Sequence, residues 1–280
     1  MSLFSAVEMA PRDPILGLNE QYNADTNPNK VNLGVGVYFD DNGKLPLLQC
    51  VQAFEKTMMD KPTARGYLPI DGIAAYDNAV KSLVFGADSE PVKSGRVATI
   101  QALGGTGGLK VGADFLKRLN PAAKVLISDP SWENHRAIFS SAGFEVDSYP
   151  YYDAATRGIN FAGLLAALQA APAGTIVLLH ACCHNPTGYD LTPAQWDQII
   201  AVIKAGNLTP FLDMAYQGFG FGIEQDGAVI AKFVAAGLNF LVSTSFSKSF
   251  SLYGERVGAL SVVCADKEEC ARVLSQLKIC

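Results

Sequence analysis

The chain has 280 residues and 49% of them are hydrophobic, so it can bury one or two substantial cores and is not intrinsically disordered. A net charge of -5, a pI near 5.2 and the lack of any Lys or Arg run exclude the basic face that a nucleic-acid partner requires. No basic stretch leads into an apolar one at the N-terminus, and nowhere do ~18 apolar residues run uninterrupted. We therefore expect no secretory signal and no membrane span. The six cysteines have no framework spacing, which indicates reduced thiols in a cytoplasmic protein.

The chain changes character at Val97. Residues 1–46 are rich in loops, and no strand–helix alternation is visible before residue 97. Beyond it, apolar runs predict strands at 97–100, 124–127, 144–146, 175–179, 210–212, 238–243 and 257–264. Amphipathic segments predict helices from the glycine-rich 104–108 to 119, then at 132–141, 161–170, 193–205 and from 267 onward. This alternation predicts an α/β fold with a mostly parallel sheet flanked by helices.

The helix that follows Thr192 has the clearest sequence signals. Thr192 is its expected N-cap, Pro193 its first residue, and Gln195 completes a capping box. Gly206 is expected to end it.

Three polar residues follow apolar runs at their carboxyl ends. They are Asn185, Asp213 and Lys248, and the glycine-rich segment 104–108 opens a helix. Parallel sheets bind ligands beyond the carboxyl ends of their strands, so we expect these residues to line one site.

The segment around Lys248 places one amine among hydroxyls and aromatic rings, with Arg256 eight positions later. Burial and a nearby cation lower the pKa of a lysine and make it a nucleophile. The hydroxyls and the guanidinium suit a phosphate dianion. An amine beside a phosphate clamp is what pyridoxal phosphate requires. Taken alone, the segment also fits an ordinary polar loop.

Short motifs occur along the chain in a fixed order. They are 13–16 (DPIL), 31–36 (VNLGVG), 67–72 (YLPIDG), 132–135 (WENH), 180–188 (HACCHNPTG), 213–219 (DMAYQGF) and 245–256 (SFSKSFSLYGER). Together they resemble the fold-type I pyridoxal-phosphate enzymes, and specifically the class I aspartate and aromatic-amino-acid aminotransferases. The resemblance implies a pyridoxal-phosphate-binding large domain over residues 47–280. Residues 1–46 would form an N-terminal arm and part of a small domain.

The same resemblance implies roles for the catalytic residues. Lys248 would hold the cofactor as an aldimine and then act as general acid and base. Asp213 would pair with the pyridine nitrogen and keep it protonated. Tyr216 and Asn185 would donate hydrogen bonds to the ring oxygen, although composition alone makes Asn185 a turn residue before Pro186.

Further residues would bind the cofactor or the substrate. By the resemblance, Trp132 stacks on the cofactor ring, and His135 braces Asp213; composition alone would make Trp132 a core residue and His135 a surface one. The phosphate would be held by Gly105, Thr106, Ser245 and Arg256. Tyr67 would reach the phosphate of a second subunit, which implies a homodimer. Gly36 would lie near the substrate carboxylate, with Trp132 and Asn185 also at the substrate.

The implied reaction moves an amino group between an aromatic or dicarboxylic L-amino acid and 2-oxoglutarate. Phe246 and the segment 251–256 resemble the bacterial tyrosine aminotransferase branch, and aspartate aminotransferase is the alternative. Members of the family continue past the position of Cys280, including the arginine expected to bind the substrate α-carboxylate. We therefore expect these 280 residues to transaminate poorly, which leaves a catalytically impaired cofactor-binding fragment as a further alternative.

Other classes fit the residues less well. Residues 245–248 spell the Ser-x-x-Lys of acyl-transfer enzymes, but the companion Lys-Thr-Gly is missing. No Gly-x-Gly-x-x-Gly follows the first predicted strand, as a nicotinamide dehydrogenase would require. A metal site at 180–184 would be crowded and lacks a second ligand pair, so we expect no metal. A non-catalytic binding module remains open.

Overall fold

The computed structural model describes residues 2–10, 16–32, 34 and 36–280. Most of the DPIL motif, together with Leu33 and Val35, lies outside the described residues. Contacts within the chain divide it into two compact units, Met1–Leu47 and Leu48–Cys280. Within its described residues, the first unit carries one helix, α1 (Leu16–Ala24), among loops.

The second unit is built on a seven-stranded sheet in the order β1-β9-β8-β7-β6-β2-β3. Only β9 runs against its neighbours, and the remaining adjacent strands are parallel, so the predicted mostly parallel sheet is confirmed. Its strands are β1 (Val97–Leu103), β2 (Lys124–Asp129), β3 (Glu145–Pro150), β6 (Ile176–His180), β7 (Thr209–Met214), β8 (Phe240–Ser245) and β9 (Val257–Val263). A separate hairpin pairs β4 (Tyr152–Asp153) with β5 (Gly158–Ile159).

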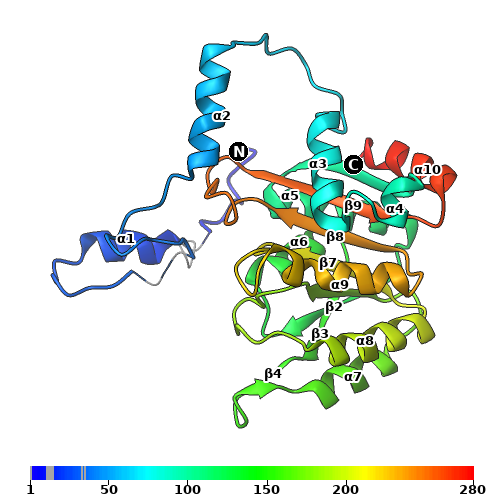
Figure 1. Cartoon of the computed structure of the whole chain (residues 1–280). Helices are drawn as coiled ribbons and strands as arrows, with labels where there is room; N and C mark the ends of the chain where they lie inside the picture. Colours follow the sequence, from blue (N-terminus) through cyan, green and yellow to red (C-terminus); the bar gives the residue numbers. More distant parts are fainter. Residues whose placement is uncertain (1, 11–15, 33, 35) are drawn as a thin grey trace. The chain divides into compact units, whose positions relative to one another are not determined.

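Helices cover both faces of this sheet. Figure 1 shows α7, α8 and α9 side by side on one face, which α3 also covers, while α5, α6 and α10 pack on the other. The helices of the second unit are α2 (Gln49–Asp60), α3 (Ala74–Phe85), α4 (Glu90–Lys93), α5 (Gly104–Leu119), α6 (Glu133–Ser141), α7 (Phe161–Ala170), α8 (Pro193–Ala205), α9 (Ile223–Ala235) and α10 (Lys267–Leu277).

The two cores follow from the alternation of side chains along the strands. In β7, Leu212 belongs to the cluster with α7, α8 and α9, whereas its neighbour Phe211 belongs to the cluster with α5 and α6. Both are fully buried. Strands with apolar residues on both faces are what a helix-covered parallel sheet requires.

The predicted capping box of α8 is confirmed. The Thr192 hydroxyl accepts from the Gln195 backbone N–H, and the Gln195 side chain accepts from the Thr192 backbone N–H at 2.8 Å. Gly206 occupies the C-cap. Between residues 49 and 93, where no element was predicted, the structure has the helices α2, α3 and α4, and the first strand begins at Val97. Among the described residues no helix is both long and apolar enough to cross a membrane.

Asp77 in α3 provides a pH-dependent contribution to stability. Its side chain is buried, and its Oδ1 has no hydrogen-bond partner within the described part of the chain. Burial first, and Asp71 in addition, raise the pKa of Asp77 to about 6, against the opposing effect of Lys81. Because the folded state then binds the proton more tightly than the unfolded state, stability falls as pH rises from about 4 through about 6.

We expect Asp77→Asn to stabilise the protein at pH 7.5 by on the order of 2 kcal/mol and to have little effect at pH 4. Chemical denaturation at both pH values measures this difference. The control is Asp88→Asn, because Asp88 is an exposed partner of Lys93. Equal stability of Asp77→Asn and the unchanged protein at pH 7.5 would contradict the expectation.

Candidate functional site

The predicted site residues from β6, β7 and β8 lie at one edge of the sheet. His180 ends β6 and pairs in register with Asp213 in β7, and Asp213 pairs with Ser243 in β8. Asn185 follows β6 by five residues, and Lys248 follows β8 by three. The parallel register therefore brings these segments together at the carboxyl ends of their strands.

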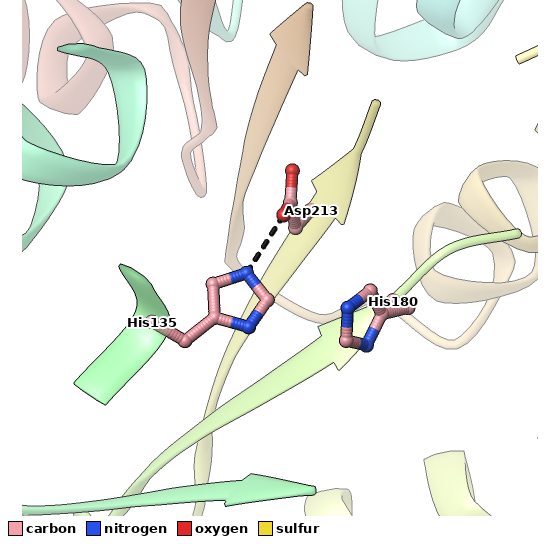
Figure 2. Close-up of side chains that lie close together, drawn as sticks. All are labelled: His135, His180 and Asp213. Carbon is pink, nitrogen blue, oxygen red and sulfur yellow. Dashed lines mark hydrogen bonds and ion pairs between the residues drawn. The ribbon is translucent and has the colours of Figure 1, made fainter. Parts of the chain in front are cut away.

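Asp213 is held from behind by a chain of buried polar groups. The ring of His135, from α6, places Nε2 at 2.8 Å from Asp213 Oδ2, as Figure 2 shows. The other ring nitrogen, Nδ1, lies 2.8 Å from the Ser131 hydroxyl. His135 is fully buried and Asp213 is 5% exposed, so the bond is shielded from water. This geometry fixes the carboxylate and leaves its Oδ1 for a further partner.

Lys248 lies close enough to Asp213 for their charges to interact. Its Nζ is 5.0 Å from the centre of the Tyr216 ring. Burial, as the largest effect, and the Arg256 guanidinium lower the pKa of Lys248, while Asp213 opposes that shift. A lysine with a lowered pKa is more often the free amine, which is the nucleophilic form.

Tyr216 and Asn185 form a pair beside this amine. The Asn185 amide donates to the Tyr216 hydroxyl at 3.5 Å, which is a long hydrogen bond. Burial and then Asp213 raise the pKa of Tyr216, against a smaller opposing effect of Asn185. The phenol therefore keeps its proton at neutral pH and can donate it to an anionic oxygen.

The N-terminus of α5, called the cradle below, carries two of the predicted phosphate ligands, Gly105 and Thr106. The helix begins at Gly104 without a side-chain cap among the described residues and with no acidic residue in its first turn. Backbone and side-chain bonds hold its start: Gly104 N donates to Arg256 O, and Ser243 Oγ donates to Gly105 O, both at 2.9 Å. Free N–H groups at a helix start bind anions.

Two glycines allow the start of α5 to lie close to Arg256 and Ser245. Gly104 has φ +68, and a Cβ there would lie 2.6 Å from Arg256 Nη2. A Cβ on Gly105 would lie 3.1 Å from Ser245 Cβ. The predicted phosphate ligands Gly105, Ser245 and Arg256 are thus in mutual proximity, with Thr106 in the first turn of the same helix.

Of the remaining predicted site residues, two lie beside Asp213 or its partner His135, and two are exposed elsewhere. Trp132 precedes α6 and lies edge-on to His135, with ring centres 5.3 Å apart. His135, which composition alone would place at the surface, is buried. Tyr67 is fully exposed in the second unit. Gly36 belongs to the first unit and is exposed there.

Two histidines at this edge were not predicted as site residues. His180 stands 4.9 Å from His135 and 4.2 Å from His184, measured between ring centres. His184 stacks on Tyr151, and its ring nitrogens lie 2.9 Å from Ser128 Oγ and 2.8 Å from Thr187 Oγ1. Burial lowers the pKa of His184 to about 4 and that of His180 well below its usual value, so both rings are neutral at pH 7. The sequence shows only that both histidines lie close together in the segment 180–184. Their position beside Asp213 follows from the register of β6 with β7.

Comparison with known proteins gives the family. The family model "Aminotransferase class I and II" matches residues 28–280. The aspartate aminotransferase of Pseudomonas aeruginosa is 65% identical over 278 residues, which cover 99% of this chain and 70% of that protein. The aromatic-amino-acid aminotransferase of Escherichia coli is 55% identical over 277 residues, with the same two coverages.

A solved structure agrees with this result. The aromatic-amino-acid aminotransferase of Burkholderia pseudomallei, covalently bound to pyridoxal phosphate, superimposes with a TM-score of 0.98 at 67% identity. The match covers all of this chain and 70% of that one. By sequence and by fold, the chain belongs to the aminotransferase class I and II family.

Proposed function

We propose that this chain binds pyridoxal 5'-phosphate and transfers an amino group between an aromatic or dicarboxylic L-amino acid and 2-oxoglutarate. The observation that carries the proposal is the convergence of Lys248, Asp213 and the uncapped α5 N-terminus at one sheet edge. An amine with a lowered pKa, a buried carboxylate and an anion cradle are the donor set that this cofactor requires. The relatives named above carry the same activity in their names.

The residues around the cradle fit the phosphate. Arg256 is beside Gly104, and its Nη1 donates to Ser247 Oγ at 3.3 Å and to the Tyr253 carbonyl at 3.0 Å, which fix the guanidinium at the loop. The first-turn N–H groups of α5 add donors without any competing carboxylate in that turn. A guanidinium and helix N–H groups together recognise a phosphate more specifically than either does alone.

Bound pyridoxal phosphate supplies an electron sink for the bond broken at the substrate α-carbon. Asp213 would keep the ring nitrogen protonated, because its Oδ2 is already fixed by His135. Lys248 would bind the cofactor aldehyde and then carry the proton between the α-carbon and the cofactor, a role worth ~10²–10⁴-fold in rate. Tyr216 and Asn185 would donate to the ring oxygen, and Trp132 would cover the ring.

We further propose a cytoplasmic homodimer. The exposed Tyr67 is free to contribute to the phosphate site of a second copy, as the family resemblance implies. Gly36 would contribute to the substrate carboxylate site. Residues 1–46 would then be arm and partial small domain, and residues 47–280 the cofactor-binding large domain.

Aspartate aminotransferase is the second candidate, because relatives named aspartate aminotransferase and relatives named tyrosine or aromatic-amino-acid aminotransferase all match this chain at high identity.

The test is a single turnover of the cofactor-loaded protein with tyrosine or with aspartate, in which release of the 2-oxo acid is measured. We expect faster release from tyrosine. Faster release from aspartate would favour the second candidate, and cofactor binding without release from either donor would identify an impaired fragment.

A further inference from the structure

A cluster of three potential metal ligands lies behind the proposed cofactor site. The side chains of His135, His180 and Asp213 come from α6, β6 and β7 and converge in Figure 2. One nitrogen from each imidazole and one carboxylate oxygen all lie within 4.8 Å of one another. Two imidazoles and one carboxylate are a ligand set that zinc enzymes use, with a fourth position left open.

The ring nitrogen Nε2 of His180 indicates that a ligand binds at this cluster. This nitrogen is enclosed by protein and has no hydrogen-bond partner among the described residues. A buried nitrogen without a partner is costly, and in native proteins it indicates a water or an ion that completes its bonding. His180 pairs in register with Asp213, so the two side chains project to the same side of the sheet.

His135 can become a ligand without losing a proton to solvent. Its Nε2 now lies 2.8 Å from Asp213 Oδ2, and its Nδ1 lies 2.8 Å from the Ser131 hydroxyl. If the ring proton moves from Nε2 to Nδ1, the Nδ1–H group donates a hydrogen bond to the Ser131 oxygen, because a hydroxyl can accept as well as donate. A metal-bound histidine usually donates its second ring N–H to such a partner.

The required adjustment is small. Ligands ~2.0–2.2 Å from a tetrahedral zinc ion are roughly 3.4 Å apart. The His135–Asp213 contact would open slightly from 2.8 Å, and His180 would approach from within 4.8 Å.

A second cluster, formed by Cys182, Cys183 and Asp226, is a weaker candidate. Both oxygens of Asp226 already accept backbone N–H groups, from Gly218 and Gly220 on one side and from Phe221 on the other. Three of the four acceptor positions of this carboxylate are therefore already used. This cluster serves as the control in the experiment.

We propose that, in the cofactor-free protein, His135 Nε2, His180 Nε2 and an oxygen of Asp213 bind one Zn²⁺ ion, which prevents pyridoxal phosphate from binding. The competition rests on the proposed function, because a metal ion on Asp213 neutralises the charge that the cofactor's ring nitrogen needs. The metal site itself does not depend on that function.

The first arm titrates the cofactor-free protein with zinc chloride in a calorimeter. We expect one ion per chain. His180→Asn should weaken binding by about 100-fold or more and Ser131→Ala by about 10-fold or more, whereas Cys183→Ser should leave it unchanged. Circular dichroism confirms that each variant is folded, and Ser131→Ala keeps the test decisive if His180→Asn does not fold. No binding, or loss of binding in Cys183→Ser alone, would overturn the proposal.

The second arm measures uptake of pyridoxal phosphate by its visible absorbance. One equivalent of Zn²⁺ should block uptake by the unchanged protein, EDTA should restore it, and His180→Asn should take up cofactor in the presence of Zn²⁺. Uptake that Zn²⁺ does not affect would overturn the competition. Absence of uptake without any metal would instead contradict the proposed function, and the calorimetric result would stand independently.

Discussion

Replacing Lys248 with alanine is expected to abolish covalent attachment of pyridoxal phosphate and to lower transamination by at least ~10²–10⁴-fold. The reason is that the half-buried Lys248 amine has a lowered pKa and lies beside Asp213 and Tyr216. Arg256, whose charge also acts on Lys248, cannot replace it as a nucleophile because a guanidinium is not deprotonated in proteins. The visible absorbance of the cofactor-treated protein, before and after borohydride, measures the attachment.

Two further variants make this result specific. Lys248→Arg keeps a positive charge but offers no nucleophile, so it should also fail to form the adduct while retaining more phosphate affinity than Lys248→Ala. Lys232→Ala removes a lysine that pairs with Asp197 on the surface of α9, and should behave as the unchanged protein. An adduct of normal yield in Lys248→Ala would contradict the assigned role.

Replacing Asp213 with alanine is expected to weaken cofactor binding by about 30- to 3,000-fold. Removing one partner of a buried, hydrogen-bonded charge pair costs about 2–5 kcal/mol, and each 1.4 kcal/mol is tenfold in affinity. Asp213 is almost fully buried and oriented by His135 at 2.8 Å, so a protonated ring nitrogen bound to it would form such a pair. Equilibrium titration with pyridoxal phosphate measures the affinity.

Asp213→Asn distinguishes the effect of the negative charge of Asp213 from the effect of its side-chain size. The amide keeps the size of the side chain but cannot hold a ring nitrogen protonated, so we expect it to bind cofactor better than alanine does and to transaminate equally poorly. Asp197→Asn is the matched surface control, since Asp197 is largely exposed. Full activity in Asp213→Asn would show that the negative charge is not required.

The sheet was predictable from sequence because both of its faces are covered. Strands such as β6 and β7 read as apolar runs without alternation, and the turn signals at their ends are strong. The start of α8 was also predictable, because its capping box is formed by residues close together in the sequence, Thr192 and Gln195. By contrast, α2 has no buried residue and no side-chain cap, so it carries neither signal, and α4 is only four residues long.

The site was predictable where a residue's position follows from the strand it ends. Asp213 and Lys248 follow or end buried runs, so their convergence is a consequence of parallel register. The burial of His135 and the convergence of His180 depend on how α6 packs against the sheet, which no local pattern encodes. Only the resemblance to aminotransferases suggested the contact between His135 and Asp213, and the structure has the two side chains bonded.

The most direct test of the central claim is peptide mapping of the protein after treatment with pyridoxal phosphate and borohydride. The account predicts one modified lysine per chain, in the peptide that contains Lys248. Modification spread over exposed lysines such as Lys56 and Lys93, with Lys248 unmodified, would contradict it.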